Sequence, residues 1–211
     1  MKQLFFVLVL CFIFIFQHPQ VCKSTPSQIK IDLKLLAEEQ KKAEVDKIMF
    51  KLEFYVDYWT DYYQIDGMKD RITEGEITKD RVYDLGLGMI KHESGFDPYG
   101  ITYEKKLKVN SWGLTRLLET TAREMGWNGK DPKELLDPDT NLKYGIKYLC
   151  WQIHRYHSLK KAVAAYNAGH TKYRKDGITY VNQWYVDMVY YDYYHYYRNC
   201  RNCQNKSIIG G

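Results

Sequence analysis

The sequence predicts an all-α fold, or an α-helical fold with a minor hairpin. Apolar residues recur at spacings of three and four in several long segments, and few stretches alternate with period two. Glycine and proline punctuate the chain between these segments and show no repeat. With 211 residues, 45% hydrophobic and 27% charged, the chain has the composition of one folded domain with an extra arm. It is neither a disordered chain nor a bundle of membrane helices.

Residues 1–24 are predicted to be a signal peptide. Lys2 supplies a positive start, and every residue from Leu4 to Phe16 is apolar. This run is too short to span a bilayer as a standard helix, and it fits the apolar region of an export signal. Small residues at 22 and 24 suit cleavage near residues 22–24. An uncleaved anchor and a lipidated Cys22 are the alternatives.

Residues 25–75 are predicted to form a helical arm and a linker. The arm should be helical over about 25–65, because apolar residues at spacings of three and four draw one stripe along it. The stripe consists of Val45, Ile48, Leu52, Tyr55, Trp59 and Tyr62. The favoured interpretation is a helix that packs on the next domain, and the alternative is a partner-binding or coiled-coil arm.

Residues 76–198 are predicted to form the main domain, followed by a C-terminal tail at 199–211. Helices are expected over about 79–93, 115–125, 139–156, 159–168 and 180–198. The first carries Val82, Leu85, Met89 and Ile90 on one stripe. The segment from Thr102 to Val109 is expected to be a short hairpin or a mobile loop.

Glu93 is the first candidate for chemistry, because it ends an apolar helix. Met89 and Ile90 lie one turn back on the same face. A carboxyl group against apolar side chains has its charged form desolvated, so its pKa should rise. A glutamic acid with a raised pKa is what a general acid needs near neutral pH.

Four sequence blocks carry a family resemblance. Residues 92–98 read HESGFDP, 111–122 read SWGLTRLLETTA, 137–142 read DPDTNL and 165–169 read AYNAG. In this order, over roughly residues 80–190, they resemble the catalytic domain of the soluble lytic transglycosylases. The resemblance implies a lysozyme-like helical domain that cleaves peptidoglycan glycan strands, in the periplasm or cell envelope or as a secreted protein.

The resemblance also implies roles for individual residues. Glu93 matches the catalytic acid, and Ser94 matches the serine that supports it and the reacting sugar. Tyr166 and Asn167 match residues that hold the glutamate and the substrate. The remaining expected cleft residues are Gly113 and Leu114, from the strip along the sugar subsites, and Tyr180, from a late Tyr-Val element.

The chain departs from the family pattern at two points. Thr115 and Arg116 replace a methionine and a glutamine that contact sugar, so they are expected in the cleft with altered contacts. Arg116 either pairs with a peptide carboxylate or faces solvent. The connector from Pro98 to Gly113 is a few residues longer than the family's and carries Glu104, so it could cover or narrow the cleft.

The reaction follows from the number of carboxyl groups. Glycosidases usually use two, and the four blocks offer one well-placed carboxyl, Glu93, since Asp97 in Asp-Pro is better interpreted as part of a turn. The substrate must then supply the rest: its N-acetyl group stabilises C1, and its own 6-hydroxyl closes a 1,6-anhydro ring on N-acetylmuramic acid. The alternatives are hydrolysis by water, as in goose-type lysozymes, and a wall-binding or assembly protein with weak catalysis.

No cofactor or metal is expected. His154 and His157 lie three residues apart, but no third ligand completes a set.

Removal of residues 1–24 takes away Lys2 and Lys23 and leaves a net charge of +3, too diffuse for nucleic acid. Cys200 and Cys203 could form a local disulfide. An envelope-complex partner would dock on the arm or on the tyrosine-rich helix.

Overall fold

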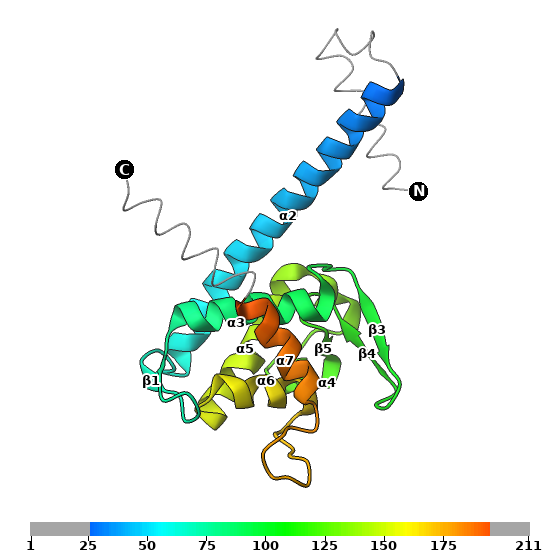
Figure 1. Cartoon of the computed structure of the whole chain (residues 1–211). Coiled ribbons are helices and arrows are strands. Elements are labelled where there is room, and N and C mark those ends of the chain that lie inside the picture. The colour runs from blue at the N-terminus through cyan, green and yellow to red at the C-terminus, as the bar shows by residue number, and fades with distance from the viewer. Residues whose placement is uncertain (1–25, 195–211) are drawn as a thin grey trace, which may run out of the picture. The chain divides into compact units, whose positions relative to one another are not determined.

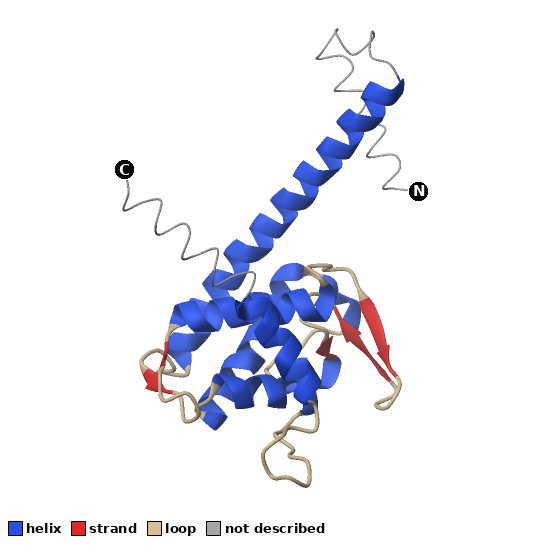
Figure 2. Ribbon diagram, viewed as in Figure 1, coloured by secondary structure: helices blue, strands red, loops and turns tan. Residues whose placement is uncertain are grey.

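The computed structural model describes residues 26–194. The predicted signal peptide with Cys22, the tail at 199–211 and the end of the tyrosine-rich segment lie outside these residues. The predicted α-helical class with a minor hairpin is confirmed (Figure 2). Among the described residues, no helix combines the length and the apolarity that a membrane span requires.

The first helix, α2, runs from Pro26 to Tyr62 and belongs to two units. Its part up to Asp46 forms a unit of its own, in which the side chains from Leu33 to Glu44 are exposed. Leu33, Leu35 and Leu36 are among these exposed side chains. Lys34 and Glu38 approach to 3.9 Å one turn apart on this surface.

From Lys47 onward, α2 is part of the main unit and buries one stripe in the core. Ile48, Leu52, Tyr55 and Trp59 are buried as the spacing predicts, together with Val56. Tyr62 is 63% exposed, so its predicted place on the buried stripe is wrong. The stripe stops at Trp59, which donates its indole N–H to the carbonyl of Lys143 at 2.9 Å.

Four helices surround the core of the main unit: α3 (Lys79–Ser94), α5 (Pro138–Tyr156), α6 (Leu159–Ala168) and α7 (Gln183–Asp192) (Figure 1). A short ladder of β1 (Met68–Lys69) and β2 (Glu76–Ile77) precedes α3. Helix α3 packs closely on α7. A Cβ atom on Gly88 would lie 2.9 Å from the carbonyl of Val189, so only glycine permits this approach.

A three-stranded antiparallel sheet follows α3. Strand β3 (Ile101–Glu104) pairs with β4 (Val109–Trp112), and β4 pairs with β5 (Leu117–Leu118). The segment that was expected to be either a hairpin or a loop is therefore a hairpin. Its end-to-end register places Glu104 opposite Val109.

Two helices are shorter than predicted. The helix expected over 115–125 is replaced by β5 and by α4 (Glu119–Glu124), because Arg116 has a φ of +46°, which a right-handed helix cannot contain. A 3-10 helix, η2 (Pro132–Leu136), then leads into α5. The last helix starts at Gln183 instead of about 180, because the backbone of Asn182, with φ of −104° and ψ of 36°, lies outside the helical region.

Candidate active site

Helix α3 delivers Glu93 to the site in its last turn. Thr78 caps the start of the helix by accepting the N–H of Arg81. Gly95 ends it in the left-handed region with a φ of +61° and donates its N–H to the carbonyl of Lys91. Met89 and Ile90, one turn before Glu93, are fully buried. The end of the helix is thus fixed, and so is the base of the Glu93 side chain.

Burial dominates the electrostatics of Glu93. It raises the pKa of this carboxyl from 4.5 to about 7. The hydroxyl of Tyr185 opposes the rise by donating a 2.5 Å hydrogen bond to Oε1. The negative charge of Glu104 adds to the rise, and Arg116 lowers the pKa. The result is a carboxyl that can both give and take a proton near neutral pH.

Two tyrosines flank this carboxyl, Tyr185 buried and Tyr166 partly buried. Tyr185 comes from α7, and burial followed by the charge of Glu93 raises its pKa well above 10. Tyr166 comes from α6, and the same two causes raise the pKa of its phenol. Both hydroxyls therefore stay protonated and act as hydrogen-bond donors, Tyr185 to Glu93 and Tyr166 to the carbonyl of Thr115 at 3.1 Å.

The loop before β5 is held by one buried amide. The side chain of Asn141 donates to the carbonyls of Trp112 and Leu135, both at 2.8 Å. Its oxygen accepts the backbone N–H of Thr115 at 2.9 Å and the hydroxyl of the same residue at 2.8 Å. Gly113 has a φ of +66°, and a Cβ atom there would lie 2.6 Å from the Asn141 amide. The glycine of the second block is thus required by packing.

Hydrogen bonds hold the Arg116 side chain against the end of α3. Its Nε donates to the carbonyl of Glu93 and its Nη1 to the carbonyl of Gly113, both at 3.3 Å. The guanidinium group covers Gly100, where a Cβ atom would clash with it. Arg116 therefore does not simply face solvent.

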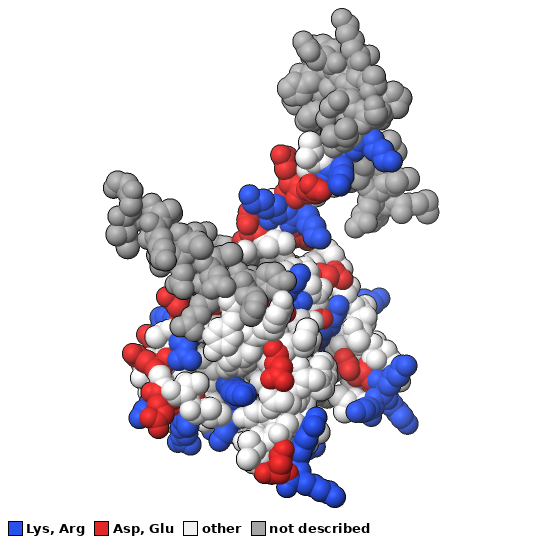
Figure 3. Space-filling model, in the orientation of Figure 1, with Lys and Arg blue, Asp and Glu red and all other residues white. Residues whose placement is uncertain are grey.

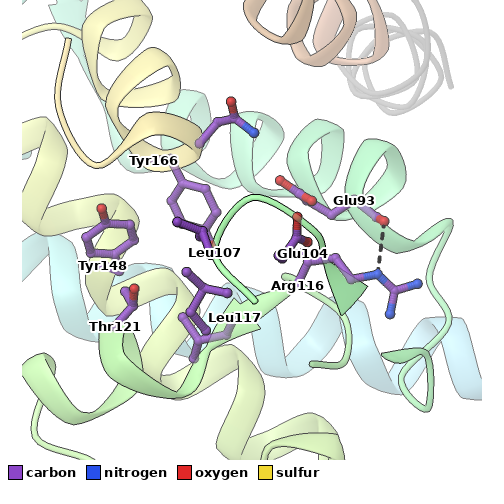
Figure 4. Close-up of a pocket in the computed structure, with 10 residues that line it drawn as sticks. Glu93, Glu104, Leu107, Arg116, Leu117, Thr121, Tyr148 and Tyr166 are labelled. Atoms are coloured by element: carbon purple, nitrogen blue, oxygen red, sulfur yellow. Dashed lines mark hydrogen bonds between the residues drawn. The ribbon is translucent and has the colours of Figure 1, made fainter. Parts of the chain in front are cut away.

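These elements enclose a small pocket of about 110 Å³ (Figure 4). It is lined by Glu93, Glu104, Leu107, Arg116, Leu117, Leu118, Thr121, Tyr148, Tyr166 and Asn167. The hairpin contributes Glu104 and Leu107, so the connector from Pro98 to Gly113 forms one wall. The Tyr166 ring lies 5.1 Å from that of Tyr148, which gives the opposite side an aromatic surface of the kind that packs on sugar.

Four residues expected at the site lie together in the pocket, namely Glu93, Arg116, Tyr166 and Asn167. Asn182 donates to the side-chain oxygen of Asn167 at 3.0 Å, which leaves the Asn167 amide nitrogen for a ligand.

The other expected residues lie outside the lining. Ser94 turns its hydroxyl to the carbonyl of Ile90 at 3.1 Å, within its own helix. Gly113, Leu114 and Thr115 are buried and belong to the loop before β5. Tyr180 is 4% exposed and packs 5.1 Å from the ring of Tyr173, away from the pocket.

The sequence reasoning missed Tyr185, which holds the glutamate. A signal was present, because the Tyr-Val pair at 180–181 recurs at 185–186. It also missed Glu104 as a pocket residue, for which no block gives a signal.

No metal site accompanies the pocket in the part of the chain that the structure describes. Over residues 26–194, no three His, Cys, Asp or Glu side chains gather as a ligand set. The His154 ring lies 6.2 Å from that of His157, and its Nδ1 is 3.0 Å from the carbonyl of Tyr63. Cys150 is buried and free, and Cys200 and Cys203 lie outside the described residues.

Sequence comparison defines the class of this domain. The sequence model of the Transglycosylase SLT domain matches residues 74–183, just over half of the 211 residues. The match contains all ten pocket residues. The chain therefore belongs to the transglycosylase SLT domain family. No curated protein sequence matches it.

Solved structures similar to this chain are soluble lytic transglycosylases. A 70-kDa enzyme in complex with bulgecin A is similar over 41% of this chain, with 25% identity and a TM-score of 0.36. The 70-kDa enzyme of Escherichia coli is similar over 54%, with 24% identity and a TM-score of 0.37. An inactive mutant of Slt from Pseudomonas aeruginosa is similar over 70%, with 17% identity and a TM-score of 0.45. The chain spans only 14%, 16% and 24% of these proteins, respectively.

Proposed function

We propose that this protein is a peptidoglycan lytic transglycosylase that cleaves the bond between N-acetylmuramic acid and N-acetylglucosamine. The observation that carries the proposal is Glu93, a carboxyl with a pKa raised to about 7, in the pocket of an SLT domain. At neutral pH a large fraction of this carboxyl is protonated, as an acid catalyst requires.

The first step is proton donation. Tyr185 occupies Oε1 of Glu93, so the acidic proton belongs on Oε2. Transfer of this proton to the glycosidic oxygen lets the C1–O bond break, and the bonding electrons leave with the oxygen of N-acetylglucosamine. The N-acetyl group of the muramic acid stabilises C1 while the bond breaks.

The second step reuses the same residue. Glu93 is now a carboxylate, and the Tyr185 hydroxyl stabilises it through the short hydrogen bond. It takes the proton of the 6-hydroxyl of the muramic acid as that oxygen bonds to C1. The product is a 1,6-anhydro ring, Glu93 is again protonated, and no water is consumed.

The other pocket residues are proposed to bind the glycan. The Asn167 amide nitrogen is free for an acetyl or hydroxyl oxygen, and the rings of Tyr166 and Tyr148 offer an apolar wall. Among the expected residues that lie outside the lining, Ser94, Gly113, Leu114 and Thr115 are proposed to shape the site and not to touch the sugar. No role in the site is proposed for Tyr180.

The test is to incubate purified peptidoglycan with the full chain and to identify the released fragments by mass spectrometry. Anhydro-muramic products are expected from the wild type and none from Glu93→Gln. The exposed Glu53 on α2 provides the control Glu53→Gln, which should behave as wild type. Binding to the wall without any release would favour the wall-binding alternative.

An envelope location follows from the proposed substrate. We propose that the chain is exported and acts in the periplasm or cell envelope. Exposed leucines on the arm, Leu33, Leu35 and Leu36, are the surface on which an envelope partner would dock. Cell fractionation with an antibody against the chain tests the location.

A further inference from the structure

The pocket holds a second carboxyl group, which the four blocks do not contain. Glu104 is the last residue of β3, and it lines the same pocket as Glu93 (Figure 4). The two groups come from different elements, one from the hairpin and one from the end of α3. Glycosidases that cleave with water use two such groups, one as acid and one as base.

The position of Glu104 is set by its partner strand. The buried hydroxyl of Ser111 on β4 donates to Oε1 of Glu104 at 2.8 Å. The backbone carbonyl of Glu104 accepts the N–H groups of Leu107 and Lys108 at 3.0 and 2.7 Å, which closes the turn. Both the backbone and one carboxyl oxygen are therefore fixed, and Oε2 has no hydrogen bond within the described residues.

No cation neutralises this carboxylate in the part of the chain that the structure describes. Arg116, the basic residue in the pocket lining, donates from Nε and Nη1 to the carbonyls of Glu93 and Gly113. The lysines beside Glu104 in the turn are exposed and form no ion pair with it. Figure 3 shows Lys and Arg side chains and Asp and Glu side chains scattered over the visible face of the molecule. Charges at such a surface are exposed to solvent and are screened by salt.

The two carboxyl groups have different surroundings. Glu93 is packed against Tyr185 of α7, and its protonated form is favoured by burial. Glu104 stands on a three-stranded sheet at the pocket wall, and its charge adds to the preference of Glu93 for the proton. Two carboxyls in unlike environments divide into an acid and a base.

We propose that Glu104 is a second catalytic residue, a general base that activates water and gives this enzyme a hydrolytic branch beside ring closure. Glu93 protonates the leaving oxygen and the C1–O bond breaks, as in the transglycosylase reaction. Glu104 takes a proton from a water molecule, whose oxygen forms the new bond to C1. The product is a reducing N-acetylmuramic acid, and the proton on Glu104 returns to Glu93 through solvent.

This inference rests on the proposed function and refines it, because both branches need Glu93 as the acid. They differ only in the base and in the oxygen that attacks C1. Ring closure uses Glu93 twice and the sugar's own hydroxyl, while hydrolysis uses Glu104 and water. The ratio of reducing to anhydro ends therefore reports on Glu104 and is independent of how much substrate binds.

The experiment measures that ratio by liquid chromatography and mass spectrometry, since an anhydro product is lighter by one water. The full chain is compared with Glu104→Gln, Glu93→Gln and the matched control Glu53→Gln. The reaction is run at about pH 5.5, below the pKa of Glu93 of about 7, so that loss of the Glu104 charge does not limit the acid step. Thermal unfolding of each variant verifies that it is folded.

We expect both products from the wild type and from Glu53→Gln. Glu104→Gln should lower the ratio of reducing to anhydro products about 100-fold, a typical contribution of a general base. Ser111→Ala retains the charge but removes the donor that orients it, and it should lower the reducing products by less. This second variant keeps the test valid if Glu104→Gln does not fold.

Three results would overturn the inference. If the wild type releases anhydro products alone, the hydrolytic branch does not exist and the proposed function stands. If Glu104→Gln lowers both products equally, or leaves the ratio unchanged, Glu104 is not the base for water. If the wild type releases nothing, the proposed function fails and the inference fails with it.

Discussion

Replacement of Glu93 by glutamine should change the stability of the protein in a pH-dependent way. Burial raises the pKa of Glu93 from 4.5 in the unfolded chain to about 7 in the native state. Between these values the native state binds more protons than the unfolded state, so its stability falls as the pH rises. Proton binding by Glu93 thus contributes to the free energy of unfolding of the wild type. This contribution is fully present below about pH 4.5 and absent above about pH 7.

The size of this loss follows from the pKa difference. At about 1.4 kcal/mol for each pKa unit, the change from 4.5 to about 7 corresponds to about 3 kcal/mol. Glutamine has the same shape as the protonated acid, can accept the Tyr185 hydrogen bond and does not ionise. Glu93→Gln should therefore gain about 3 kcal/mol relative to the wild type between about pH 4 and pH 8.

Urea unfolding at a series of pH values, followed by tryptophan fluorescence, measures this difference. The slope of the free energy against urea should be equal for the two proteins, so that the comparison is one of stability alone. Glu53→Gln removes an exposed carboxyl and should stay within about 0.5 kcal/mol of the wild type. A stability difference between Glu93→Gln and wild type that is constant with pH would refute the assignment of Glu93 as a buried acid.

Three further substitutions test the site and its support. Tyr185→Phe removes the hydrogen bond that lowers the pKa of Glu93, so the alkaline limb of kcat/KM should move to higher pH; a limb that stays in place would contradict this. Asn141→Ala leaves the loop at Thr115 without its buried partner and should cost about 3 kcal/mol in urea unfolding, and a loss below about 1 kcal/mol would show that the loop holds itself. Gly88→Ala forces α3 away from α7 and should cost about 1–3 kcal/mol in the same assay; an unchanged midpoint would mean that the two helices separate freely.

Much of the helical framework could be predicted because it is encoded locally. A spacing of three and four decides which face of a helix is buried, and the stripe of Val82, Leu85, Met89 and Ile90 is indeed buried. Caps and left-handed glycines mark the ends of helices, as at Gly95 and Gly169. The helix predicted over 115–125 failed because the left-handed Arg116 is set by contacts with other parts of the chain.

The candidate site was only partly predictable for the same reason. Glu93, Tyr166 and Asn167 could be predicted as site residues, because short contiguous blocks carry them and the ends of two helices present them. Tyr185, which the sequence reasoning missed, holds the carboxyl in place of the expected Tyr180, since the packing of α3 on α7 sets which hydroxyl reaches it.

Glu104 is the pocket carboxyl whose position could not be predicted from the sequence. The separation of Glu104 and Glu93 along the chain does not determine where the Glu104 side chain lies, because a connector of this length can adopt many conformations. The hairpin register and the hydroxyl of Ser111 turn it into the pocket. The helical fold, the family and the candidate acid Glu93 could be predicted from local periodicity and contiguous motifs. The side chains from distant elements that surround Glu93 could not be predicted, because their positions depend on strand pairing and helix packing.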